Sequence, residues 1–229
     1  DQQQQEALAQ QAEPGDVMLS RKNWYLSNVG LPGFWPHALL YLGEADQLET
    51  YFDTPEVRGW VREQTGQDIG FVEFLAREYP RAWVEYQRRD ESGPRRVIEA
   101  ISEGVVFNTL AHAAGDYLAV MRPRLSKLAK AQAIAAAFGH HGKPCDFDFD
   151  FATDHALVCT ELVWRSYRPA EGKEGLRMSL VELAGRRTLP ANEFARVFSE
   201  GIESSDRQFD FVAFLDADHR ADVDWLSQS

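Results

Sequence analysis

The sequence predicts an α+β domain, because strand-like and helix-like patterns follow one another along its 229 residues. Two short apolar runs indicate strands: residues 37–42, which lie between a proline and a glycine, and residues 96–101. A helical spacing of apolar residues begins at Cys159. These three elements are the part of the chain in which reactive side chains stand out from apolar surroundings.

The N-terminal segment, residues 1–13, is polar and rich in glutamine, and the chain begins with Asp1 rather than Met. We expect this segment to be a leader or tether outside the core of a mature or trimmed chain. Residues 14–229 are then expected to form one domain, because they contain no internal repeat and no linker and their length suits a single large core.

A helical insertion is predicted at about residues 47–95, between the two strands. Residues 55–64 and 70–87 carry apolar side chains at helical spacing, and Pro80 divides the second run into two helices or one kinked helix. The aromatic residues of the insertion either shape a substrate cleft or form a small core of their own. We favour the second interpretation.

The same periodicities predict the remaining elements. They are a strand at 117–122 ended by Pro123, a helix at 126–138 stopped by Gly139, short helices at 179–183 and 190–198, a strand at 209–216 and a short docked helix within 220–229.

Three reactive side chains lie in these apolar elements. Cys159 begins a helix, where unsatisfied N–H groups favour a thiolate and lower the pKa of the thiol, although a buried structural cysteine is the alternative. His37 opens an apolar strand and Glu99 lies among apolar neighbours, so both need polar partners. If the three meet, the thiolate attacks, the imidazole moves protons and the carboxylate fixes the imidazole tautomer. His155, just before the helix, ranks behind His37 as the base.

A wider order of segments surrounds these residues. The motif PGDVML at 14–19 precedes His37 in its strand, and VIEA at 97–100, GKPCD at 142–146 and CTELV at 159–163 follow. This order resembles the permuted NlpC/P60 enzymes, the YiiX/YebB-like branch of papain-like cysteine hydrolases, which is related to the lecithin:retinol acyltransferase group. The resemblance covers most of residues 14–168. It implies a papain-like fold in circularly permuted order, with a small antiparallel sheet packed on a cysteine helix that follows the histidine strand.

The resemblance also implies catalytic roles. Cys159 is expected to be the nucleophile, His37 the general base and acid, and Glu99 the residue that orients His37. Cys145 departs from the family pattern, because a tyrosine near the nucleophile usually occupies that place. No tyrosine hydroxyl is then available there for the oxyanion site, whereas the backbone N–H of Cys159 remains. The candidates for substrate binding are Trp35, Tyr41 and Cys145.

Composition and motifs exclude several functions. The formal net charge of −12 argues against nucleic-acid binding and against attachment to anionic lipid, and no run is long enough to span a bilayer. The aspartates within 146–154 lack the glycine and glutamate of a calcium loop, and we find no CxxC, HExxH or phosphate loop. We therefore expect neither a metal nor a cofactor. Both cysteines are expected to be free, because a disulfide would consume the nucleophile.

The predicted function is cysteine-dependent hydrolysis of an amide or ester bond through an acyl-thioenzyme. The resemblance implies a peptide or lipid-like small substrate, either a cell-wall peptide or a lipid acyl group. It favours a bacterial cell-envelope location, periplasmic or lipid-tethered, over the cytoplasm. Two alternatives stay open: an acyltransferase of the lecithin:retinol acyltransferase type, and a non-catalytic ligand-binding module on the same fold.

Overall fold

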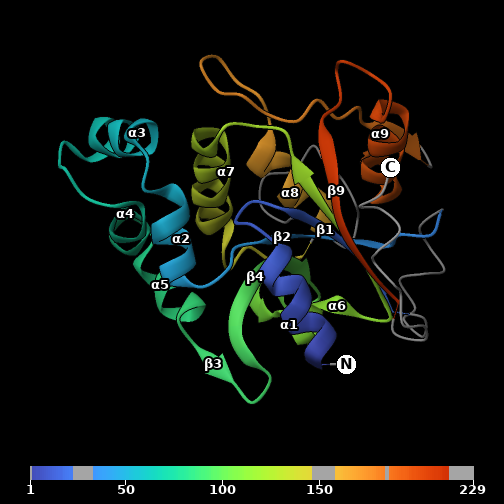
Figure 1. Ribbon diagram of the computed structural model, residues 1–229, viewed down its shortest axis with the longest axis horizontal. Helices are drawn as coiled ribbons and strands as arrows, with labels where there is room; N and C mark the ends of the chain where they lie inside the picture. The colour runs from blue at the N-terminus through green and yellow to red at the C-terminus, as the bar shows by residue number, and fades with distance from the viewer. Residues whose placement is uncertain (1, 23–32, 146–157, 184–185, 217–229) are drawn as a thin grey trace.

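The computed structural model describes residues 2–22, 33–145, 158–183 and 186–216. Seven strands form one sheet: β1 (Val17–Arg21), β2 (His37–Tyr41), β3 (Arg89–Asp90), β4 (Gly93–Ile101), β5 (Gly104–Thr109), β6 (Tyr117–Pro123) and β9 (Phe209–Asp216). The strand order is β3-β4-β2-β1-β6-β9, with β5 paired to β4, and these pairs are antiparallel (Figure 1). A separate hairpin is formed by β7 (Val181–Leu183) and β8 (Arg186–Thr188).

The helices of the described residues are distributed along the whole chain. They are α1 (Gln2–Gln11), α2 (Ala45–Phe52), α3 (Pro55–Thr65), α4 (Phe71–Glu78), α5 (Pro80–Tyr86), α6 (Leu110–Ala114), α7 (Lys127–His140), α8 (Cys159–Tyr167) and α9 (Asn192–Gly201).

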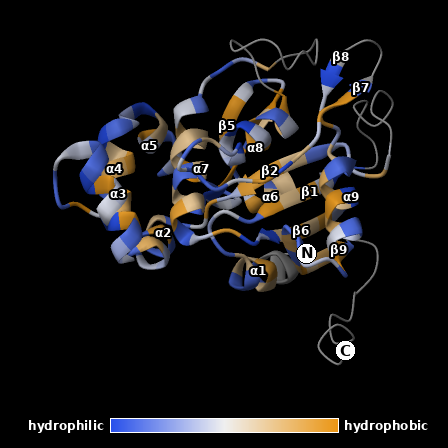
Figure 2. Ribbon diagram, turned by 90° about the horizontal axis from the view of Figure 1, so that it is seen from above, coloured by the Kyte–Doolittle hydropathy of each residue, from blue (hydrophilic) through white to orange (hydrophobic). Residues whose placement is uncertain are grey.

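Helices cover both faces of the sheet. Side chains of β1 alternate, so that Val17 and Leu19 join the cluster that contains α7 and α8, whereas Met18 joins the cluster that contains α1 and α6. Hydrophobic residues of β1 and β2 accordingly gather in the middle of the molecule (Figure 2). Because both faces are covered, a central strand such as β2 is apolar at nearly every position, which explains its continuous apolar run in the sequence.

Most of the predicted elements are confirmed. The strands at 37–42, 96–101, 117–122 and 209–216 correspond to β2, β4, β6 and β9. The helix predicted at 126–138 is α7, in which Ser126 caps the first turn by accepting from the N–H of Ala129 at 3.1 Å. This helix continues through Gly139 to His140, so the glycine does not stop it.

Residues 70–87 of the insertion form two helices, α4 and α5, where one kinked helix was the alternative, because Pro80 is the first residue of α5 and its missing N–H costs nothing there. The expected separate core is wrong. The ring of Phe138 in α7 packs with the rings of Tyr79, Trp83 and Tyr86, which joins the insertion to the main core. The aromatic residues therefore anchor these helices to the domain.

Two further segments differ from expectation. Residues 1–13 were expected outside the core, but Leu8 and Ala12 are each 2 % exposed and pack against the sheet. Leu8 and Ala9 of α1, together with Ala12 just after the helix, pack into the cluster that covers this face of the sheet and seat α1 there. The run at 179–183 contains the strand β7 instead of a helix. So short an apolar run fits both the helical period of 3.6 and the strand period of 2, and the pairing with β8 makes it a strand. Residues 220–229 lie outside the described residues.

Candidate active site

Cys159 is the first residue of α8, at the position that the sequence predicted. The preceding residue, Val158, is extended (φ −90°, ψ 164°), and its carbonyl accepts from the N–H of Leu162 at 3.0 Å, which starts the helix. Leu162 and Val163 are fully buried and hold the helix in the core. The side chain of Val158 provides no cap. Because Cys159 is the first residue of α8, the positive end of the helix dipole lies at its thiol.

His37 and Glu99 lie on the same face of two neighbouring strands. Tyr41 of β2 pairs directly with Val97 of β4, and the side-chain period of two places His37 on the face of Tyr41 and Glu99 on the face of Val97. The Nε2 of His37 donates to Oε2 of Glu99 at 2.6 Å. The side chain of Glu99 is 3 % exposed and that of His37 is 22 % exposed. Each polar group thus supplies the partner that burial of the other requires.

Asn108 completes the contacts of the carboxylate, although no pattern in the sequence marked it as a site residue. Its Nδ2 donates to Oε1 of Glu99 at 2.7 Å. Glu99 pairs with Val106 across β4 and β5, so Asn108, two residues further along β5, is a diagonal neighbour on the same face. A carboxylate with both oxygens bonded has a fixed orientation, which holds the imidazole proton at Nε2. Nδ1 of His37 is the nitrogen that remains for the thiol.

The thiol of Cys159 hydrogen-bonds to His37, and the backbone N–H groups of Ala38 and Thr160 also donate to the sulfur. Burial by itself would raise the pKa of Cys159, but the positive charge of His37 and these donors outweigh it and lower the pKa below 9.0. Burial would likewise lower the pKa of His37, but the Cys159 thiolate and Glu99 raise it to about 10. Both shifts favour the form of the pair in which Cys159 is a thiolate and His37 an imidazolium.

The charge of Glu99 follows from the same contacts. Burial by itself would raise the pKa of Glu99, but the hydrogen bond and charge of His37, followed by the hydrogen bond from Asn108, lower it below 4.5. An ionised carboxylate at this place stabilises the imidazolium and keeps the ring oriented. The three residues named from the sequence thus form one connected row with the charges that nucleophilic catalysis requires.

The substrate-binding candidates lie in different places. Trp35 is half-buried two residues before His37, with its ring edge-on to Phe34 and Phe214. Cys145 is half-buried and is a reduced cysteine; just before it, the N–H of Gly142 donates to the carbonyl oxygen of Val105 in β5, and the N–H of Val105 donates to the carbonyl oxygen of Lys143. Cys159 is likewise a reduced cysteine. A substrate-binding role for Trp35 and Cys145 stays a prediction.

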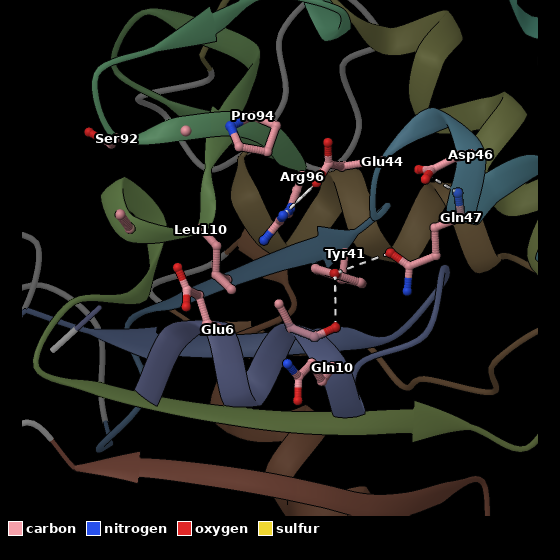
Figure 3. A pocket seen from close by; sticks show the side chains of 13 residues that line it. Glu6, Gln10, Tyr41, Glu44, Asp46, Gln47, Ser92, Pro94, Arg96 and Leu110 are labelled. Atoms are coloured by element: carbon pink, nitrogen blue, oxygen red, sulfur yellow. Dashed lines mark hydrogen bonds and ion pairs between the residues drawn. The ribbon is translucent and has the colours of Figure 1, made fainter. Parts of the chain in front are cut away.

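Tyr41 lies at the other end of β2 from His37. It is 1 % exposed, and its hydroxyl, 3.4 Å from the carbonyl oxygen of Ala9, borders a cavity of about 550 Å³ that Glu44 and Arg96 also line (Figure 3). The lining of that cavity does not include Cys159, His37 or Glu99 among the described residues. The position of Tyr41 therefore separates it from the reactive row.

Other expectations concern metals, membranes and the segment before α8. Within the described ranges, no group of three or more His, Cys, Asp and Glu side chains is placed to hold a metal ion. None of the helices in those ranges is long and apolar enough to cross a membrane. His155 and the aspartates of 146–154 lie outside the described residues.

The fold and the site together define a class: an α+β domain of papain-like type in permuted order, with the histidine strand before the cysteine helix. The chain belongs to the permuted papain-like amidase family YaeF/YiiX, the C92 peptidase family, whose model matches residues 11–207. This membership supports a cysteine hydrolase-type function and confirms the expected fold.

One solved structure, described as the metalloprotein yiiX from Escherichia coli O157:H7 (DUF1105), is similar to the chain. The two are 17 % identical with a TM-score of 0.50, and the match covers 90 % of this chain and 99 % of the other. At this identity the likeness concerns the fold. No curated protein matches the sequence.

Proposed function

We propose that this protein is a cysteine-dependent hydrolase that cleaves an amide or ester bond through an acyl-thioenzyme. The observation that carries the proposal is the hydrogen-bonded row of Cys159, His37 and Glu99, with the thiol at a helix N-terminus and the carboxylate buried. Such a row supplies a nucleophile, a proton carrier and an orienting group together. Membership of an amidase family favours the amide bond over the ester bond.

Acylation follows from the charges of the row. The thiolate of Cys159 attacks the substrate carbonyl carbon, and the carbonyl electron pair moves onto the oxygen, to which the backbone N–H of Cys159 donates. The imidazolium of His37 gives its Nδ1 proton to the leaving nitrogen or oxygen as the bond to carbon breaks. A thioester on Cys159 and a neutral imidazole remain.

Deacylation reverses these roles. Nδ1 of His37 takes a proton from water while the water oxygen attacks the thioester carbon. The carbon–sulfur bond then breaks, the carboxylic acid leaves, and the thiolate and imidazolium are restored. Glu99 keeps its hydrogen bond to Nε2 throughout and holds the ring in place.

The substrate that we propose is a small peptide or lipid-like molecule with an acyl group on nitrogen or oxygen. A cell-wall peptide is the first choice, since the family is described as amidases, and a lipid acyl group is the second. The location that fits either substrate is a bacterial cell envelope.

Trapping the acyl-enzyme tests the proposal directly. After brief exposure to panels of activated amides, esters and phospholipids, intact-mass spectrometry should show one added acyl group, and peptide mapping should place it on Cys159. The adduct should decay as free acid appears, because water attacks the thioester. Faster decay with an added amine, giving the amide, would support acyl transfer. Tight ligand binding without adduct or product would support a binding module, and an adduct on Cys145 would contradict the assignment.

Glu99→Gln should lower kcat/KM by roughly 100-fold or more, because a neutral amide no longer stabilises the imidazolium. The amide also meets a conflict, since its oxygen must accept from His37 while its NH₂ faces the donor Nδ2 of Asn108. Glu99→Gln/Asn108→Asp replaces that donor by an acceptor and should recover part of the activity. Steady-state kinetics measure both variants. A double variant no better than Glu99→Gln would refute a contribution of Asn108 through Glu99.

A further inference from the structure

The chain just before His37 is held by one side chain from a distant helix. Asn192, the first residue of α9, accepts through Oδ1 from the N–H groups of Phe34 (3.0 Å) and Trp35 (3.1 Å). Its Nδ2 donates to the carbonyl oxygen of Trp35 at 3.0 Å. The amide thus bonds the backbone of Trp35 on both sides, as a neighbouring strand would.

The fit between Asn192 and this segment is close. Gly33 has φ +107°, and a Cβ there would lie only 2.2 Å from Nδ2 of Asn192. The position therefore requires glycine both for its backbone angle and for the approach of the amide. On the other side, Nη1 of Arg21 donates to the carbonyl oxygen of Phe34 at 2.7 Å.

The helix that carries Asn192 is itself anchored. Phe194 is fully buried, with its ring centroid 6.4 Å from that of Phe209 in β9, and α9 lies beside β9 (Figure 1). The amide is thus attached to a helix seated on the sheet and not to a free loop. A group on a seated helix keeps its position more precisely than one on a loop.

This contact matters because the sheet pairing of His37 ends at that residue. The pairing of β1 with β2 runs from Val17 and Leu40 to Ser20 and His37, and it does not continue into residues 33–36. His37 must nevertheless keep Nε2 on Glu99 and its other nitrogen on the thiol of Cys159. The backbone immediately before it needs a substitute for a strand partner.

We infer that Asn192 is a positioning residue: its amide clamps the backbone of Phe34 and Trp35 and so holds the imidazole of His37 in line between Cys159 and Glu99. It acts through His37, because its hydrogen bonds described above join the backbone of Phe34 and Trp35 and not the thiol of Cys159 or the carboxylate of Glu99. This inference rests on the proposed function. It adds a fifth chain segment, from α9, to the machinery that β2, β4, β5 and α8 provide.

The test compares Asn192→Ala, Asn192→Asp and Arg196→Ala with the full-length parent. Arg196→Ala is the matched control, because Arg196 lies on the same helix and, among the residues that the structure describes, forms its ion pairs with Glu193 and Glu200. The rate of Cys159 alkylation by iodoacetamide is measured from pH 5 to 10 by peptide mass spectrometry. Each rate is divided by the folded fraction from thermal unfolding, so that loss of stability alone does not count.

Asn192→Ala should slow Cys159 alkylation about tenfold at pH 7 and move its midpoint to higher pH, because a displaced imidazolium stabilises the thiolate less. Asn192→Asp should lie between this variant and the parent, since it keeps the acceptor for two N–H groups and loses the donor. Arg196→Ala should match the parent. On a substrate, Asn192→Ala should lower kcat more than it raises KM.

Gly33→Ala provides an independent route to the same contact. Gly33→Ala should slow Cys159 alkylation as Asn192→Ala does. The Gly33→Ala/Asn192→Ala double variant should be slowed by less than the product of the two single factors, because the amide that the added Cβ would meet is absent. If the double variant is slowed by the full product of the two single factors, the two residues do not act through a shared contact.

Two failures are distinguishable. If the parent has a depressed alkylation midpoint and Asn192→Ala shares its midpoint and rate per folded molecule, Asn192 is only structural and the inference is overturned. If Cys159 of the parent reacts as an ordinary thiol, the proposed function fails and the inference fails with it.

Discussion

Cys159→Ser should remove nearly all turnover, lowering kcat by about 10⁴-fold or more, while the protein still folds. The hydroxyl of serine is far less acidic than a thiol, so the surroundings that produce a thiolate here do not produce an alkoxide. Substrate affinity should change little, and the variant should retain bound substrate. Product formation, ligand binding and thermal unfolding measure these three quantities.

The matched control for this change is Cys145→Ser, the same substitution at the other cysteine of the chain. It should keep kcat within about tenfold of the parent, since the sulfur that His37 contacts is that of Cys159. Comparable losses for both variants would contradict the assignment of the nucleophile. Undiminished turnover by Cys159→Ser would do so more directly.

His37→Ala should lower kcat/KM by about 10³-fold or more, because the variant loses both the proton carrier and the cation that stabilises the thiolate. Cys159 alkylation at pH 7 should fall by at least about 30-fold, since burial without His37 favours the neutral thiol. The matched control is His112→Ala, at an exposed histidine of α6. Equal alkylation rates for His37→Ala and the parent would rule out an activated pair.

The same pair sets a pH dependence of stability. The pKa of His37 is raised from 6.5 to about 10, so its contribution is complete below pH 6.5 and is lost as the pH rises toward 10. The pKa of Cys159 is lowered from 9.0, so its contribution is complete above pH 9.0 and is lost as the pH falls through the lowered value. Because the contribution of His37 falls with pH while that of Cys159 rises, the two slopes should cancel in the range just below pH 9.0, and the contribution of the pair to the unfolding free energy should decline as the pH rises from 9.0 toward 10.

Denaturant unfolding of the parent and of His37→Ala across pH 5 to 10 measures this contribution as a difference. Subtracting the variant removes the titration of the many other acidic groups. A difference that does not decline between pH 9.0 and 10 would contradict a thiolate–imidazolium pair in the folded protein.

The sequence by itself determined the candidate reactive residues. A cysteine at the start of a helical pattern, a histidine opening an apolar strand and a glutamate inside another are local features, visible from periodicity and from the cost of burying a polar group. The structure brings these residues together as expected. Most strands and helices were also local enough to be predicted, because a covered sheet or a seated helix leaves a clear apolar period.

Predictions from hydrophobic periodicity were wrong in segments where only a few apolar residues indicate the period. The strand at Val181–Leu183 is too short to distinguish a period of 2 from one of 3.6, and pairing with β8 settles it. In residues 1–13, two buried side chains among polar neighbours gave too weak a pattern to indicate that α1 packs on the sheet. The insertion aromatics likewise joined the main core through Phe138, a contact that no local pattern contains.

Only the tertiary structure identified the residues that hold the row in place. Asn108 reaches Glu99 because the register of β4 and β5 makes them diagonal neighbours, and Asn192 reaches Trp35 across 157 positions of sequence because α9 docks beside β9. A single asparagine has no period and no spacing motif, so its partner is unknown until strand register and helix docking are known. The reactive residues are evident from local chemistry, whereas their supports depend on non-local packing.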